Sequence, residues 1–151
     1  MKKSHRIASF VESLDTGAHP DQDPHYVGYF VCFNDQRYYE AHDVLEQLWL
    51  KSHGAHHQFF KGLIQLAGAF VHLKKQYLRP GHAKDGRRLR PACRLFRIAQ
   101  SNLEPFAPKF LGLDVAEATR LCAANIAAIE HSEFRKNPWK PEKAPRLTMN
   151  P

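Results

Sequence analysis

Apolar residues recur three and four positions apart along most of the chain, which is the spacing of amphipathic α-helices. Near the N-terminus this pattern predicts a short helix within residues 1–15. Its apolar face consists of Ile7, Phe10, Val11 and Leu14. Prolines, a glycine and three aspartates then indicate a loop from Asp15 to Pro24. The content of aromatic and β-branched residues in residues 25–33 would allow a strand, but their position beside helical segments favours a short helix.

The rest of the chain repeats the helical pattern, interrupted by turn residues. We expect helices over residues 34–51, 58–78, 82–103 and 115–135. Asn34 or Asp35 is the expected N-cap of the first of these, and Pro91 predicts a kink or a restart in the third. Strand signals are nearly absent elsewhere, so the prediction is an all-α fold, a single compact helical bundle of about five helices.

Two ranges divide the chain in this interpretation. Residues 1–135 form the helical domain, and the proline-rich tail over 136–151 is expected to be extended or disordered. The sequence shows no internal repeat and no second domain. A single bundle of this size can bury a core without disulfide or metal staples.

The helix expected over 34–51 carries two polar side chains where a core is predicted. On a helical projection His42 lies inside the apolar stripe and Glu46 flanks it. These residues are four positions apart, so their side chains can meet. A carboxylate next to a core is costly unless it is paired, so Glu46 needs a partner, and His42 is the first candidate.

The long apolar helix over 58–78 supplies further polar groups. They form one stripe, made of Gln58, Lys61, Gln65 and His72. Antiparallel packing against the preceding helix would bring Gln65 and His72 towards His42 and Glu46. One interpretation is a buried polar network that fixes helix register and has no other role.

The other interpretation is a functional site, and it is our leading hypothesis. The site would be a polar pocket centred on His42 and Glu46, binding a small polar ligand or a divalent metal. Its other candidate residues are Tyr39, Trp49, Gln65 and His72. With His42, Glu46 and His72 as ligands, the donor set would suit Zn²⁺ or Fe²⁺. The sequence does not decide whether the protein is an enzyme.

Two sequence motifs in this region resemble those of a known family. They are "FNDQRYYEAHDVLEQLW" and "FFKGLIQLAGAFVHL". They are similar to the bacterial and archaeal domain-of-unknown-function family 309. Its pattern corresponds here to Asn34, Tyr39, Glu40, Ala41, His42, Asp43, Glu46 and Trp49, followed by Gly62, Leu63, Ile64, Gln65, Ala67, Ala69 and His72. Asp43 stands where the family commonly has Glu. The resemblance covers about 25–130 and implies a compact helical bundle, with no activity attached.

Composition places the chain among ordinary globular proteins. Of its 151 residues, 43% are hydrophobic and 25% are charged. No apolar run is long enough to cross a bilayer, and the N-terminus lacks the apolar region of a signal peptide. Cys32, Cys93 and Cys122 are far apart and odd in number, as expected for reduced thiols. We therefore expect a cytoplasmic protein without a membrane partner.

The net charge of +7 points to an alternative function. Between residues 74 and 97 there are nine Lys or Arg residues and one acid, Asp85. Four arginines would share one helix face opposite the core, namely Arg87, Arg90, Arg94 and Arg97. Such a stripe could bind phosphates of a nucleic acid or another anionic partner, or could simply be solvated. No nucleic-acid-binding motif and no interleaved aromatic residue supports it.

A third alternative assigns the chain a structural or assembly role. In that case the buried polar network only fixes the fold. The helix faces rich in small residues would then form a homo-oligomer interface.

Overall fold

The computed structural model describes residues 2–15, 19 and 21–150, and over these residues the protein is a helical bundle. The helices are α1 (Lys3–Ser13), α2 (Pro24–Asn34), α3 (Tyr38–Trp49), α4 (Gly54–Leu78), α5 (Leu89–Leu103) and α6 (Val115–His131). Short 3₁₀ helices span Glu104–Phe106 (η1) and Pro141–Lys143 (η2). A small antiparallel hairpin, β1 (Lys109–Phe110) with β2 (Leu113–Asp114), was not expected. The predicted all-α class and the compact bundle are confirmed.

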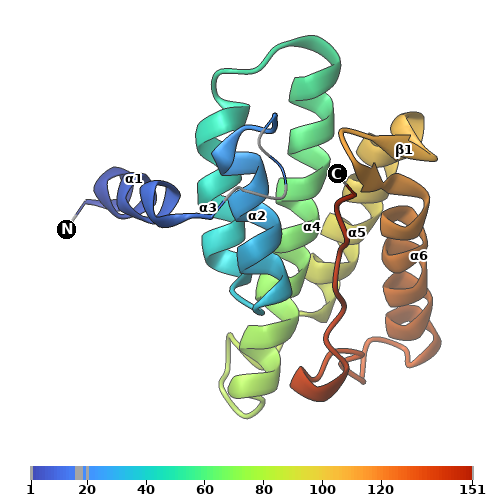
Figure 1. Cartoon of the computed structure of the whole chain (residues 1–151). Helices are drawn as coiled ribbons and strands as arrows, with labels where there is room; N and C mark the ends of the chain where they lie inside the picture. The colour runs from blue at the N-terminus through green and yellow to red at the C-terminus, as the bar shows by residue number, and fades with distance from the viewer. Residues whose placement is uncertain (1, 16–18, 20, 151) are drawn as a thin grey trace.

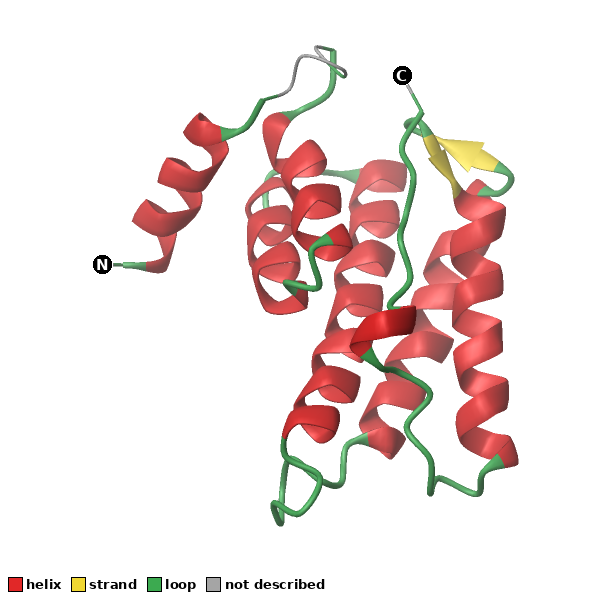
Figure 2. Cartoon of the chain, turned by 60° about the horizontal axis from the view of Figure 1, so that its bottom comes forward, coloured by secondary structure: helices red, strands yellow, loops and turns green. Residues whose placement is uncertain are grey.

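The long helix α4 lies at the centre of the bundle. It packs against α3 on one side and α5 on the other. Helix α2 packs on α3 and lies in front of it in Figure 1, and α6 packs on the outer side of α5. Helix α1 extends away from this body, while the C-terminal chain returns along it to the hairpin (Figure 2). None of the helices in the described part of the chain combines the length and apolar character that crossing a membrane requires.

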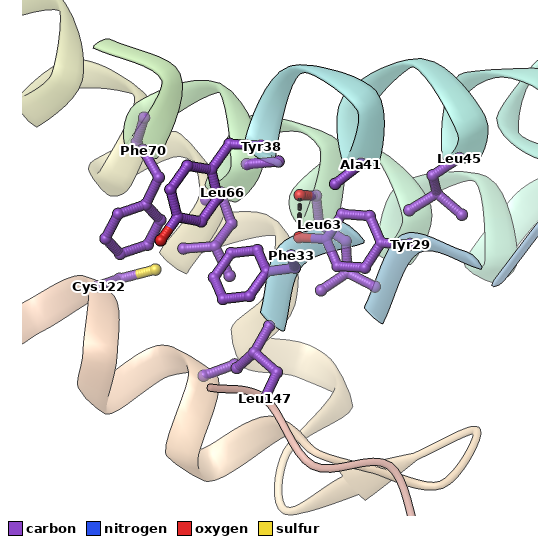
Figure 3. Packing of buried hydrophobic residues seen from close by; sticks show 14 of the residues in the cluster. Tyr29, Phe33, Tyr38, Ala41, Leu45, Leu63, Leu66, Phe70, Cys122 and Leu147 are labelled. Atoms are coloured by element: carbon purple, nitrogen blue, oxygen red, sulfur yellow. Dashed lines mark hydrogen bonds between the residues drawn. The ribbon is translucent and has the colours of Figure 1, made fainter. Parts of the chain in front are cut away.

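The core is richest in aromatic rings where α2, α3 and α4 meet. Phe33 contacts Tyr38 and Phe70 edge to face, with ring centroids 5.2 and 5.5 Å apart. Tyr29 is fully buried, and its hydroxyl donates a 2.6 Å hydrogen bond to the carbonyl oxygen of Leu63 (Figure 3). This bond satisfies the one polar group that the ring carries into the core. The three cysteines are free and buried.

The start of α3 differs from the sequence-based expectation. Neither Asn34 nor Asp35 caps α3, because α2 continues to Asn34 and a turn containing Gln36, at φ 63°, precedes α3. The N-cap of α3 is Arg37, without a side-chain hydrogen bond. Asn34 bonds elsewhere: its Nδ2 donates to the carbonyl oxygen of Leu147 at 2.9 Å, and its Oδ1 accepts from the Leu147 amide at 2.8 Å.

Three other helix boundaries also shift. Helix α4 begins at Gly54, four residues earlier than expected, and α5 begins at Leu89, seven residues later than expected. Pro91 lies in the first turn of α5, where its missing N–H costs no helical bond, so the restart occurs just before it. Helix α6 ends at His131, since Glu133 and Phe134 take φ values of 56° and 60°.

Residues 136–150 form a segment that we call the C-terminal strap. It runs along the bundle and buries Trp139, Leu147 and Met149. The Trp139 indole donates to the Tyr38 hydroxyl at 3.0 Å, and Met149 forms a β-bridge with Leu113. The proline content of the strap suits this extended path, while its apolar residues complete the core.

Candidate functional site

Helix α3 places a histidine and two carboxylates on one surface. His42 Nδ1 lies 3.2 Å from Asp43 Oδ1, and His42 Nε2 lies 3.9 Å from Glu46 Oε2. The spacing of four residues therefore brings His42 and Glu46 together, as expected. Their side chains are 34% and 30% exposed, so they lie at the surface and not in the core. Asp43, at 15%, is the most enclosed of the three.

Helix α1 supplies a counter-charge to this surface. The Lys3 ammonium lies 3.1 Å from Asp43 Oδ1 and 3.5 Å from Glu46 Oε1. The hydrogen bond to Asp43 raises the pKa of Lys3, and the charge of Glu46 adds to this effect. The lysine is nearly half exposed, so the pairs contribute at most about 1 kcal/mol to stability. Their clearer effect is to fix where α1 sits against α3.

A groove of about 390 Å³ separates α1 from α3. Its lining is chemically mixed, with basic, acidic and apolar side chains. The lining residues include Lys3, Arg6, Arg37, Glu40, Asp43 and Phe10. The Arg37 guanidinium lies 5.5 Å from the centre of the Phe10 ring, a cation–π arrangement across the groove. The volume is within the range of about 300–1,000 Å³ typical of small-molecule sites.

The two aromatic residues proposed as walls of the pocket lie in different places. Tyr39 lines the groove and is 58% exposed, with the His42 ring 6.4 Å away and the Lys75 ammonium 5.4 Å from its centre. Trp49 lies at the opposite end of α3 and stacks on His57 at 4.7 Å. Its buried indole Nε1 has no hydrogen-bond partner among the described residues. Tyr39 therefore belongs to the groove, and Trp49 does not.

The expected approach of Gln65 and His72 to His42 and Glu46 is wrong. Gln65 Oε1 accepts a 2.7 Å hydrogen bond from Asn102 Nδ2 of α5, and His72 contacts Arg88, which leads into α5. The polar stripe of α4 thus faces α5.

Small residues explain this choice of neighbour. A Cβ on Gly62 would lie 2.8 Å from Leu103 Cγ, and one on Gly68 would lie 3.2 Å from Leu95 Cδ1. Both leucines belong to α5. The glycines therefore allow close approach of α5, and the polar stripe that shares their face is carried to the same interface.

His72 is held as a neutral hydrogen-bond acceptor. Its Nδ1 accepts from Arg88 Nη1 at 3.1 Å, and burial together with the Arg88 charge lowers the pKa of His72 to about 4. Asp85 pairs with the same arginine, and that hydrogen bond lowers the pKa of its carboxyl. The predicted metal set of His42, Glu46 and His72 is therefore not assembled. Within the described ranges, no cluster of three or more His, Cys, Asp or Glu side chains is arranged to hold a metal ion.

The arginine stripe is exposed, and two of its members contact residues of α6 or of the turn that follows it. Arg90, Arg94 and Arg97 are exposed on α5, and Arg87 precedes the helix. Arg97 forms an ion pair with Glu130. The Arg90 guanidinium lies 4.2 Å above the centre of the Phe134 ring. Sequence reasoning missed both neighbours because they lie more than 30 residues away in the chain.

Residues 26–82 match the family described as a domain of unknown function (DUF309). The chain is therefore similar to this family over residues 26–82, which we call the DUF309 segment. The match confirms the resemblance seen in the sequence, although it is shorter than the expected range of 25–130. The DUF309 segment contains α2, α3 and α4, and therefore the His42 surface, while α1 and the arginine stripe lie outside it. No curated protein and no solved structure matches the chain.

Proposed function

We propose that the protein binds a small zwitterion, of the size and charge arrangement of an amino acid, in the groove between α1 and α3. One observation carries this proposal. Guanidinium groups and carboxylates line the same 390 Å³ groove together with aromatic side chains. A polar molecule with two opposite charges finds a counter-charge for each in such a groove.

The lining groups suggest how the ligand would be oriented. Arg6 is exposed and offers a planar guanidinium that suits a carboxylate or phosphate. Glu40, also exposed, can accept hydrogen bonds from an ammonium group. Phe10 and Tyr39 supply flat apolar surface for the remaining part of the molecule.

His42 and Glu46 act in this proposal as positioning residues. His42 contacts Asp43 and Glu46 contacts Lys3, so the two side chains hold one acidic and one basic residue of the groove wall. The α3 wall lies within the segment that matches DUF309, whereas the α1 wall lies outside that segment. Ligand preference is therefore expected to depend on both walls.

The proposal is tested by NMR with the twenty common amino acids as probes. We expect one or a few of them to shift backbone amides of α1 and of the α3 region near Glu40 in ¹⁵N-labelled protein. Arg6→Gln and Glu40→Gln should each weaken the response at least several-fold. Arg120→Gln makes the same charge change as Arg6→Gln at an exposed residue of α6, so it is the matched control for that variant and should leave the response unchanged. If no probe shifts these amides, or Arg6→Gln responds like wild type, the groove is not the ligand site.

The state of the cysteines supports a cytoplasmic location as part of the proposal. All three thiols are free. Burial raises the pKa of Cys32 to about 11 and that of Cys122 to about 12, so both stay protonated and poorly reactive at neutral pH. Free buried thiols are typical of proteins from reducing compartments.

A further inference from the structure

The exposed face of α5 borders a basic groove that ends against the residues after α6. Two adjoining hollows of about 360 and 150 Å³ share Arg90 and Phe134. We call this surface the arginine groove and define it by Arg87, Arg90, Arg94, Arg97, Glu130 and Phe134. Helices α5 and α6 run side by side on the flank of the bundle away from α1 (Figure 1).

The turn after α6 places an aromatic ring in this groove. Glu133 and Phe134 adopt left-handed backbone conformations, and the Phe134 amide donates to the Ile129 carbonyl oxygen at 3.0 Å. Ser132 Oγ accepts from the Lys136 amide at 3.0 Å and closes the turn. As a result the Phe134 ring stacks with the Arg90 guanidinium. The stripe of arginines thus has the aromatic partner that the α5 sequence lacks.

Positive charge in the groove exceeds what the neighbouring acids neutralise. Glu130 pairs with Arg97, and Glu133, which lines the larger hollow, pairs with Arg135. Arg87 and Arg94 form no ion pair with any described residue. Two guanidinium groups of the row therefore remain open to an anionic ligand.

We propose that the arginine groove binds single-stranded nucleic acid. Arginines three or four residues apart recur at about 5–6 Å along a helix axis, which gives a row of bidentate phosphate donors. The stacked Arg90–Phe134 pair presents flat surfaces on which a base can stack. Aspartate and glutamate side chains would use the charges of this groove but carry no ring to stack on the Arg90–Phe134 pair, whereas every nucleotide carries both a phosphate and a base. The arginine groove lies outside residues 26–82 and is independent of the groove between α1 and α3.

Fluorescence anisotropy with labelled oligo-dT and oligo-U, measured over a range of salt concentrations, tests the proposal. We expect binding at low salt that weakens as salt is added, because phosphate contacts release counterions. Arg94→Gln should weaken binding and reduce the salt slope by about 0.7, the value for one contact to a single strand. Phe134→Leu should weaken binding without changing the slope. Glu130→Gln should strengthen binding several-fold, because it frees Arg97 and removes a negative charge.

Arg120→Gln controls for the loss of net charge at a site distant from the groove, and it should bind like wild type. Circular dichroism melting of each variant separates lost binding from lost folding. The absence of binding to both oligonucleotides at low salt overturns the proposal. Equal binding of a duplex, with no effect of Phe134→Leu, assigns the groove to a duplex backbone instead. Equally strong competition by polyglutamate assigns it to an acidic protein. If Arg94→Gln and Arg120→Gln weaken binding equally, the oligonucleotide is attracted by the net charge of the protein and not by the arginine groove, and the proposal is overturned.

Discussion

The side chain of Asn34 fastens the C-terminal strap to α2, and its removal gives the sharpest stability prediction. The amide makes both a donor and an acceptor contact with the backbone of Leu147, at 2.9 and 2.8 Å. Two hydrogen bonds at about 0.5–1.5 kcal/mol each give an expected loss of about 1–3 kcal/mol in the free energy of unfolding for Asn34→Ala. Leu147 itself is 2% exposed, so release of this point would also uncover apolar surface.

Asn34→Asp separates the two hydrogen bonds. The carboxylate can still accept from the Leu147 amide, but it cannot donate to the carbonyl oxygen and repels it. We expect this variant to be at least as unstable as Asn34→Ala at neutral pH. The difference in free energy of unfolding between this variant and wild type should become smaller below about pH 4, because the protonated carboxyl can then donate to the carbonyl oxygen.

Urea unfolding measures the free energy, and trypsin cleavage after Lys143 or Arg146 reports release of the strap. Both Asn34 variants should be cleaved faster than wild type under native conditions. Asn125→Ala is the matched control, because the Asn125 amide donates to the carbonyl oxygen of Leu121 within its own helix and, among the described residues, bonds to no other segment. A change below about 0.5 kcal/mol for Asn34→Ala, with cleavage unaltered, would refute the role of Asn34.

Three further predictions concern α4 and its contacts. Because the pKa of His72 falls from 6.5 to about 4 on folding, the unfolded chain binds the additional proton, and stability should fall as the pH drops from 6.5 to 4. The shift corresponds to about 3 kcal/mol of unfolding free energy, reduced to about 1–2 kcal/mol for this half-buried ring. In His72→Gln the urea midpoint should therefore change less with pH over this range. Gly62→Ala should cost about 1–3 kcal/mol in thermal unfolding, since its Cβ would meet a leucine of α5 at 2.8 Å. Tyr29→Phe removes the hydroxyl that donates to Leu63 and should cost about 0.5–1.5 kcal/mol in urea unfolding.

Each of these predictions has a comparison that could contradict it. A pH profile of His72→Gln identical to that of wild type would show that this ring does not carry the acid sensitivity. Gly68→Ala, with its nearest contact at 3.2 Å, should be milder than Gly62→Ala, and the reverse order would refute the packing account. A fully stable Tyr29→Phe variant would mean that the hydroxyl contributes no net stabilisation.

Helix periodicity was sufficient to predict the bundle and the contact of His42 with Glu46. These features depend on spacing along one helix, which the sequence contains directly. The same projection could not say which helix would cover the polar stripe of α4. Gln65 and His72 would suit α3 or α5 equally by polarity, and the answer depends on the fit of two leucines of α5 against glycines.

Contacts made across long stretches of chain were the least predictable. Asn34 has the residue type of a helix cap, but its partner is the backbone of the strap more than 100 residues away. Phe134 lies inside the helix expected over residues 115–135, but it reaches Arg90 because that helix ends at His131 and Glu133 and Phe134 then take left-handed conformations.

The strap also constrains the order in which the protein can mature during translation. Residues 136–150 are synthesised after the six α-helices, yet they supply Trp139 and Leu147, which cover the aromatic surface of α2 and α3. A nascent chain that has released α6 but not the strap therefore carries uncovered rings. Such an intermediate is a natural substrate for chaperones. The aromatic rings become covered when the strap docks and Asn34 forms its two hydrogen bonds with the backbone of Leu147.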